Sequence, residues 1–298
     1  MNANRVLDGR LKRPLGFAFA FALTATQALA AGDGASEGLP PHAPILWEFG
    51  FFKINSSMII TWIVAAVLII CSRIATANIK AVPEGAQNFW EWLVESLYTF
   101  LEGIIGHELV KKTFWFFASV FIFILFTNWS GLFPGVGSIG WGYPTDHGFH
   151  VTRPLFRGTH ADFNMTFGMA LVFFVCWTVW ALQSNGPGGF IKHLFAPKGH
   201  FTGALKALML VVFFAVGLLE VVSILFRPVS LSFRLFGNVF AGETMLETMA
   251  HMGGNWGWLT ALPFYFMELL VGVIQALVFM LLTAVFTLLI CSHEEGHH

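Results

Sequence analysis

The sequence places a row of polar and ionisable residues inside its most apolar region. The row comprises Glu220, Ser223, Arg227, Ser230, Arg234 and Asn238, spaced three or four residues apart. On an α-helix such residues share one face, and Leu, Phe and Val fill the rest of the circumference. A guanidinium at the bilayer centre costs about 3 kcal/mol on insertion scales, and it persists where it pairs, faces water or serves a conduction path. This face therefore predicts ion or proton transfer through a membrane, with Arg234 at its centre.

Further polar side chains follow on the same segment and on the last apolar segment. Glu243 comes nine residues after Arg234, about half a turn away from its face. Glu268 and Gln275 are seven residues apart and share one face of the last segment. The offset between Glu220 and Glu243 suits two separate aqueous half-channels with the arginine between them.

A structural interpretation of these groups competes with the functional one. Polar side chains on membrane helices also form interhelical hydrogen bonds and ion pairs, each worth about 1 kcal/mol. For Ser230 and Asn238 both interpretations stay open. Arg227 precedes Pro228, and it could instead extend its guanidinium toward the cytoplasmic surface. For Arg234 and Glu220 we favour a function, because intramembrane ionisable groups are usually functional.

The composition is that of a membrane protein. Of 298 residues, 56% are hydrophobic and only 11% are charged. The formal net charge of −1 argues against nucleic acid as a partner. Cys71, Cys176 and Cys291 lie far apart, in or beside apolar segments. Their spacing fits neither a metal site nor a disulfide framework, so we interpret them as packing residues.

Five apolar segments are long enough to cross about 30 Å of hydrocarbon, in some cases with their flanks. They cover residues 58–74, 113–133, 163–183, 204–251 and 259–291. The fourth contains no turn signal except Pro228. Two spans meeting there would place two arginines in hydrocarbon, so we predict one long, tilted helix bent at the proline. The fold class is thus an all-α polytopic membrane protein, with residues 32–298 as one membrane domain.

The segments between the spans have their own signatures. Residues 86–110 predict an amphipathic helix along the cytoplasmic interface, although its acidity also fits packing against a partner subunit. Residues 32–53 and 134–160 are rich in Gly and Pro and are expected to be loops. Asp162 is placed to cap the third span. The Asn185–Gly189 segment should break the chain after that span.

The N-terminus resembles a secretory signal. Within residues 1–31, four basic residues precede a short apolar core, and Ala28-Leu29-Ala30 fits a cleavage site. A disordered or weakly membrane-bound tail is the alternative. Lysines in the connections after the first and third spans predict that those connections are cytoplasmic. Five crossings then place the N-terminus outside and the C-terminus in the cytoplasm.

No constellation for covalent or hydrolytic chemistry is present. The sequence contains no Gly-rich phosphate loop, H-E-x-x-H or G-x-S-x-G. We therefore expect no catalytic residue, cofactor or metal site, and we interpret the histidine-containing tail, 292–298, as at most an adventitious metal binder. A membrane-embedded cofactor holder would have to use the remaining histidines, most of which we expect in solvated loops. They are His107, His147, His150, His160 and His251.

One string is similar to a known family. Pro228-Val-Ser-Leu-Ser-Phe-Arg234-Leu-Phe-Gly-Asn238-Val-Phe-Ala-Gly-Glu243, followed by Glu268 and Gln275, resembles subunit a of the F-type ATP synthase. The resemblance extends from the first span to the C-terminus. It implies that Arg234 is the essential arginine facing the carboxylates of a rotating ring. It also maps Glu220, Glu243, Asn238, Glu268 and Gln275 onto the half-channels. Some relatives have histidine where this chain has Glu268, so the proton relay there could differ.

The resemblance also implies a setting. The chain would be a single-copy, non-catalytic subunit of a hetero-oligomer in a bacterial inner membrane. Its partners would be a ring of c subunits, the b subunits of the peripheral stalk and membrane lipid. The alternative is a self-contained ion or solute transporter, which would work without the ring. The sequence does not fix the transported ion as a proton or sodium.

Overall fold

A computed structural model describes residues 43–49, 52–133, 136, 139–145, 148–195 and 204–291. The predicted leader and the histidine-containing tail lie outside these residues. The chain forms two compact units. Among the described residues, the first contains those within 43–66, 125–162 and 238–273, and the second contains those within 67–124, 163–237 and 274–291.

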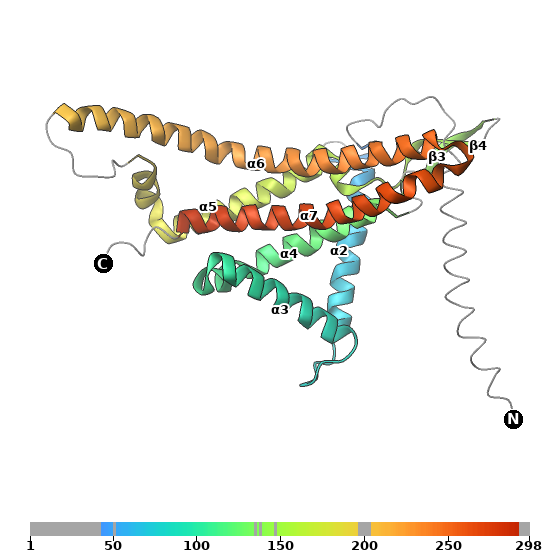
Figure 1. The fold of residues 1–298 in the computed structure, drawn as a ribbon, viewed down its shortest axis with the longest axis horizontal. Coiled ribbons are helices and arrows are strands. Elements are labelled where there is room, and N and C mark those ends of the chain that lie inside the picture. Colours follow the sequence, from blue (N-terminus) through green and yellow to red (C-terminus); the bar gives the residue numbers. More distant parts are fainter. Residues whose placement is uncertain are drawn as a thin grey trace. The chain divides into compact units, whose positions relative to one another are not determined.

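Helices make up most of the described chain (Figure 1). They are α2 (Ser56–Ala75), α3 (Ala86–Ile105), α4 (His107–Gly131), α5 (Phe163–Phe195), α6 (Ala204–Met252) and α7 (Gly257–Cys291), with short 3-10 turns at Thr159–Ala161 and Gly254–Trp256. In this part of the chain, five helices are long and apolar enough to cross a membrane, all except α3. The chain is therefore an all-α, multi-pass membrane protein, as the sequence predicts.

The long apolar segment is one continuous helix. α6 spans 49 residues with Pro228 in its interior, and Figure 1 shows it as an unbroken coil. No hairpin forms at the proline, which agrees with the penalty for burying two arginines in a turn. α5 differs from expectation, because helix continues past residue 183 to Phe195. Gly186 interrupts it with a φ of 68°, a conformation that favours glycine, so the predicted break is a kink between two helical parts.

Two β-hairpins occur where the sequence indicates loops. β1 (Ile45–Phe49) pairs antiparallel with β2 (Phe52–Asn55), and β3 (Gly140–Thr145) pairs antiparallel with β4 (Gly148–Pro154). The prediction of plain loops was wrong here, because short strands of aromatic and β-branched residues are hidden among glycines and prolines. The hairpins meet through Trp47 and Trp141, whose rings pack edge-on with centroids 6.4 Å apart.

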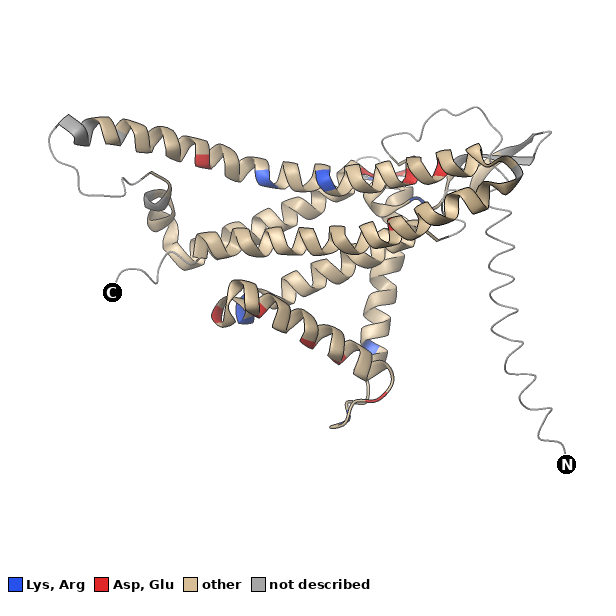
Figure 2. Ribbon diagram, in the orientation of Figure 1, with Lys and Arg blue, Asp and Glu red and all other residues tan. Residues whose placement is uncertain are grey.

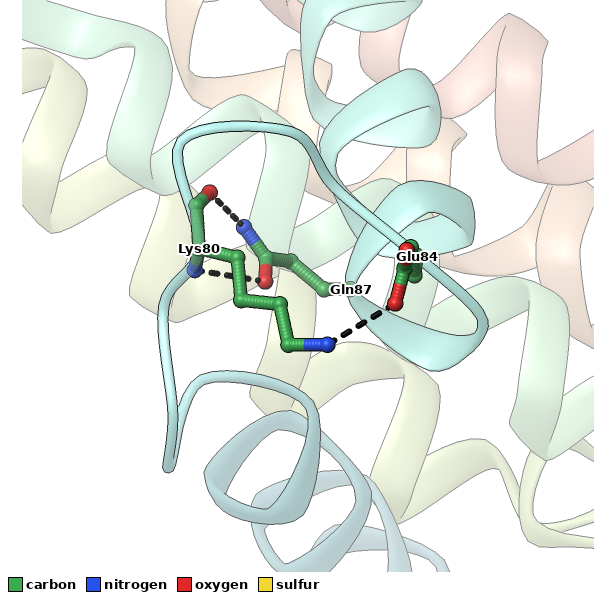
Figure 3. Close-up of polar contacts among 3 residues, drawn as sticks. All are labelled: Lys80, Glu84 and Gln87. Carbon is green, nitrogen blue, oxygen red and sulfur yellow. Dashed lines mark hydrogen bonds and ion pairs between the residues drawn. The ribbon is translucent and has the colours of Figure 1, made fainter.

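The start of α3 is fixed by side chains of the preceding connection (Figure 3). Gln87 Oε1 accepts a hydrogen bond from the Lys80 backbone N–H at 3.1 Å. Gln87 Nε2 donates a hydrogen bond to the Lys80 backbone carbonyl at 3.0 Å. Lys80 Nζ pairs with Glu84 at 2.8 Å. The helix is amphipathic, since Leu97 and Leu101 are buried. Its place at a membrane interface stays a prediction.

In the first unit, the end of α4 is joined to the first half of α7. Asn128 donates its amide to the Gly272 carbonyl at 3.2 Å, and the Trp129 indole donates to the Leu269 carbonyl at 3.1 Å. The Tyr265 hydroxyl donates to the Leu132 carbonyl. A methyl group at Gly272 would lie 3.3 Å from Asn128 Cβ, a tight contact, so the two helices approach closely at a glycine.

In the second unit, aromatic side chains pack α4, α5 and α7. Phe116 contacts Phe173 and Trp180, with ring centroids 6.4 Å and 5.5 Å apart. The buried Trp177 donates its indole N–H to the Phe286 carbonyl at 3.1 Å. Such side-chain bonds to backbone carbonyls satisfy polar groups that lipid could not.

Candidate functional site

Charged residues follow one another in a fixed order along α6. Acidic Glu220 comes first, Arg227 and Arg234 lie in the middle, and Glu243 follows. Figure 2 shows this order along α6 as an acidic position, two basic positions and then acidic positions. At about 1.5 Å per residue, Glu220 and Glu243 lie about 21 Å and about 14 Å from Arg234 along the axis. The two carboxylates thus come before and after Arg234 along one continuous helix.

Arg234 is the exposed member of the pair of arginines. Its side chain is exposed, while the neighbouring Leu231, Ser232 and Leu235 are buried. Within the described residues it forms no ion pair and no hydrogen bond. A guanidinium on a membrane helix needs a partner or water. The Arg234 side chain is therefore accessible to water or to a group of another chain.

Arg227 is surrounded differently. Its Nη2 lies 3.2 Å from Glu220 Oε1. Its guanidinium carbon lies 5.5 Å from the Trp177 ring centroid and 4.6 Å from that of Phe286, both within cation–π range. Arg227 thus has an internal partner for its charge and for its planar faces. Sequence reasoning left its role open, because the aromatic partners come from distant segments.

The remaining residues of the predicted site differ in exposure. Ser230 and Asn238 are exposed on α6, on the side of Arg234. Gln275 is buried on α7, with 3% of its surface exposed. Glu268, earlier on α7, is also largely buried. The exposed pair can reach a partner or water, whereas the two α7 residues are enclosed by their own chain.

In the first unit, Glu243 lies against the segment that leads into α5. A Cβ at Gly158 would overlap the Glu243 carboxylate, so this backbone must be glycine for the acid to occupy its place. The preceding residue, Arg157, is buried and attracts the carboxylates of Glu243 and Asp162. Burial lowers the pKa of Arg157, and the two acids oppose that shift. Arg157 stays charged and gives Glu243 a cationic neighbour.

Glu268 lies close to this cluster. Its carboxylate occupies the space beside Gly242, where a Cβ would overlap it. It also interacts electrostatically with Glu243. The first unit therefore brings together two acids of the predicted site, one from α6 and one from α7.

Asp162 anchors the same segment to α2. Its Oδ2 accepts hydrogen bonds from Ser57 Oγ at 3.0 Å and from Asn55 Nδ2 at 3.2 Å. Asp162 is fully buried and directly precedes α5. The capping role expected for it is not tested by these contacts, but they give the carboxylate a long-range structural role.

His160 is a buried member of this region. Its Nδ1 lies 2.7 Å from Asn128 Oδ1, and only 1% of its surface is exposed. Because an amide oxygen only accepts, Nδ1 carries the proton. Burial lowers the pKa of His160 to about 3, so its ring is neutral. The expectation of a solvated loop histidine was wrong for this residue.

The other histidines do not join it. His107 is exposed at the start of α4 and pairs with Glu102, and His251 is exposed at the end of α6. His147 and the side chain of His150 lie outside the described residues. Across the part of the chain that is described, no three His, Cys, Asp or Glu side chains gather as metal ligands would.

Comparison with known proteins follows the same segments. The model of the ATP synthase A chain family matches residues 58–287. The chain belongs to this family. ATP synthase subunit a of Solidesulfovibrio magneticus is 33% identical over 260 residues, covering 83% of this chain and 94% of the relative. The subunit a of Desulfotalea psychrophila is 30% identical over 250 residues, covering 84% and 90%.

A third relative gives the same result. ATP synthase subunit a 3 of Pelobacter propionicus is 34% identical over 237 residues, covering 80% of this chain and 87% of its own. Membership of the ATP synthase A chain family implies a subunit of a multi-subunit membrane complex. The family match begins within α2 and ends within α7. It therefore contains all the residues described above around Arg227 and around Glu243, except Asn55 and Ser57.

Proposed function

We propose that this chain is the static, proton-conducting subunit of the membrane sector of an ATP synthase. The observation that carries the proposal is Arg234, an exposed arginine without an ion pair among the described residues, on a long apolar helix. A ring of c subunits with membrane-embedded carboxylates would supply its missing partner. The arginine would hold each passing carboxylate in its ionised form and block direct proton leakage.

Two half-channels would bring protons to and from this point. Glu243 and Glu268 would belong to the outer route, assisted by Asn238, and Glu220 to the inner route. Gln275 and Ser230 would line the paths near the arginine. The support is the spacing of Glu220 and Glu243 on opposite sides of Arg234 along α6, and the clustering of the two outer acids in the first unit.

The energetics suit rotation. Each proton that descends the membrane potential releases about 2.3 kcal/mol per 100 mV, and several protons per turn drive the ring. An arginine keeps its charge when desolvated, whereas a lysine shifts its pKa readily when buried. The chain itself would hold no nucleotide and catalyse no bond formation.

The setting follows from the same proposal. The chain would lie as a single copy in a bacterial inner membrane, next to the c-ring, the b subunits of the peripheral stalk and lipid. Its N-terminus would be outside and its C-terminus in the cytoplasm. Lysines in the connection after α2 and at the start of α4 support a cytoplasmic location for these segments.

The test is ATP-driven proton pumping by the whole complex in inverted vesicles. Arg234→Ala should abolish pumping, and Arg234→Lys should fail as well. Arg73→Ala, which removes an exposed arginine at the end of α2, is the matched control and should pump normally. Co-purification of the complex would show that assembly is intact. Normal pumping by Arg234→Ala would refute the proposal, and ion transport by the purified chain alone would favour a self-contained transporter.

A further inference from the structure

Arg227 is held by groups from three helices of the second unit. Its own helix, α6, supplies Glu220, at 3.2 Å from Nη2. α5 supplies the Trp177 ring, 5.5 Å from the guanidinium carbon, and α7 supplies the Phe286 ring, at 4.6 Å. The two aromatic residues are joined to each other, since Trp177 Nε1 donates to the Phe286 carbonyl at 3.1 Å.

This arrangement fixes the position of the guanidinium. Cation–π contacts strengthen when the cation is desolvated, and only 16% of the Arg227 side chain is exposed. Trp177 has only 2% of its surface exposed, and its indole is oriented by a backbone carbonyl. A flexible lysine would keep the charge but lose the planar stacking. The site is therefore built for an arginine in one orientation.

The fixed guanidinium of Arg227 restricts the position of its ion-pair partner, Glu220. It lies two helical turns before Arg227 and has 47% of its side chain exposed. One carboxylate oxygen is thus tethered to a fixed cation, while the group stays open to its surroundings. An acid that exchanges protons with water needs this combination of a defined position and access.

We propose that Arg227 is a positioning residue of the inner proton route and that it acts through Glu220. The aromatic pair of Trp177 and Phe286 holds the guanidinium, and the guanidinium holds Glu220 in place beside a permanent positive charge. This inference rests on the proposed function, because it assigns Glu220 to the inner proton route. The two arginines of α6 then have separate tasks: Arg234 meets a group outside the chain, and Arg227 orients a group within it.

A double-mutant cycle tests the coupling. In the intact complex, Arg227→Gln and Glu220→Gln should each lower the rate of ATP-driven proton pumping by about fivefold, equivalent to ~1 kcal/mol. If Arg227 acts through Glu220, the double variant should pump as slowly as Glu220→Gln alone. Effects that multiply in the double variant would show an independent role and overturn the inference, as would normal pumping by Arg227→Gln.

A second variant leaves all charges in place. Phe286→Leu removes one ring from the guanidinium and should slow pumping in the same direction as Arg227→Gln, by a smaller factor. The same substitution at Phe214, which packs on Phe195 elsewhere in the second unit, is the matched control and should have no effect. Equal rates for the two leucine variants would contradict an aromatic clamp.

The result for Arg234→Ala distinguishes a failure of this inference from a failure of the proposed function. If that variant is inactive and the double-mutant cycle is multiplicative, only the role of Arg227 fails. If Arg234→Ala pumps normally, the proposed function is refuted, and the assignment of Glu220 and Arg227 to an inner proton route is refuted with it.

Discussion

At the scale of single residues, identical side chains in this chain differ by their surroundings. Arg227 lies between two aromatic rings and beside a carboxylate, whereas Arg234 on the same helix is exposed. Helical spacing alone puts both on one face and cannot tell them apart. The difference arises from Trp177 and Phe286, which are distant in sequence. Residue type and spacing thus predict which side chains matter, and tertiary packing decides how each is used.

His160 provides a prediction at this scale. Burial lowers its pKa to about 3, from about 6.5 in an unfolded chain. Between these values the unfolded state binds more protons, so the free energy of unfolding falls as the pH decreases. From pH 7 to pH 5 this residue should cost about 2 kcal/mol of stability. The thermal midpoint of the detergent-solubilised protein, measured across this range, checks the loss.

His160→Gln is the matched variant for that measurement. Its amide can still donate to Asn128 Oδ1, but it does not titrate. The part of the slope that belongs to His160 should be absent from this variant. Identical pH dependence in both proteins would mean that the imidazole is protonated in the folded state or contributes nothing.

At the scale of elements, close approach depends on glycines. The segment before α5 reaches the Glu243 carboxylate only because Gly158 has no side chain. Gly158 has a φ of −48°, which alanine also adopts, so a substitution there changes space and not backbone conformation. A substitution of Gly158 therefore tests the effect of displacing the Glu243 carboxylate.

Gly158→Ala should therefore impair transport without preventing folding. The added methyl group would displace the Glu243 carboxylate, and a shift of about 1 Å in such a group can cost up to about a hundredfold in rate. Proton pumping by the intact complex in inverted vesicles measures the loss, which we expect to be at least about tenfold. Gly103→Ala on α3, where no atom lies within 4 Å of the new Cβ, should leave pumping unchanged. Wild-type pumping by Gly158→Ala would show that Glu243 need not occupy this place.

The elements also show what a sequence reveals. The five spans and the continuity of α6 follow from hydropathy and from the cost of turning at two arginines, and the structure confirms them. The hairpins were missed because their strands are short and lie in segments rich in glycine and proline. Arg157 was missed, and His160 was wrongly expected to be solvated, because burial of a loop depends on the helices around it. The one signal that pointed there was their position, two charged or titratable groups just before Asp162 at the start of a span.

At the scale of the whole molecule, each helix that crosses the membrane changes the side on which the next connection lies. Of the five helices in the described chain that are long and apolar enough to cross, α4 separates the segment between α2 and α3 from β3, so a crossing by α4 would place the two on opposite sides. Lysines follow α2 and begin α4, and by the positive-inside rule we expect these ends to be cytoplasmic. The hairpin of β3 and β4 would then be outside, together with the turn between α6 and α7.

Single cysteines introduced into a chain without Cys71, Cys176 and Cys291 test this topology. Ala81→Cys and Ile139→Cys both replace exposed residues, one before α3 and one at the start of β3. A membrane-impermeant maleimide should label Ile139→Cys in spheroplasts and Ala81→Cys only in inverted vesicles, because each thiol is accessible from one side. Proton pumping by both variants would show that the complex is assembled. Labelling of the two positions from the same side would remove one crossing from the fold, and labelling of both from the cytoplasmic side would also reverse the assignment of Glu220 to the inner route.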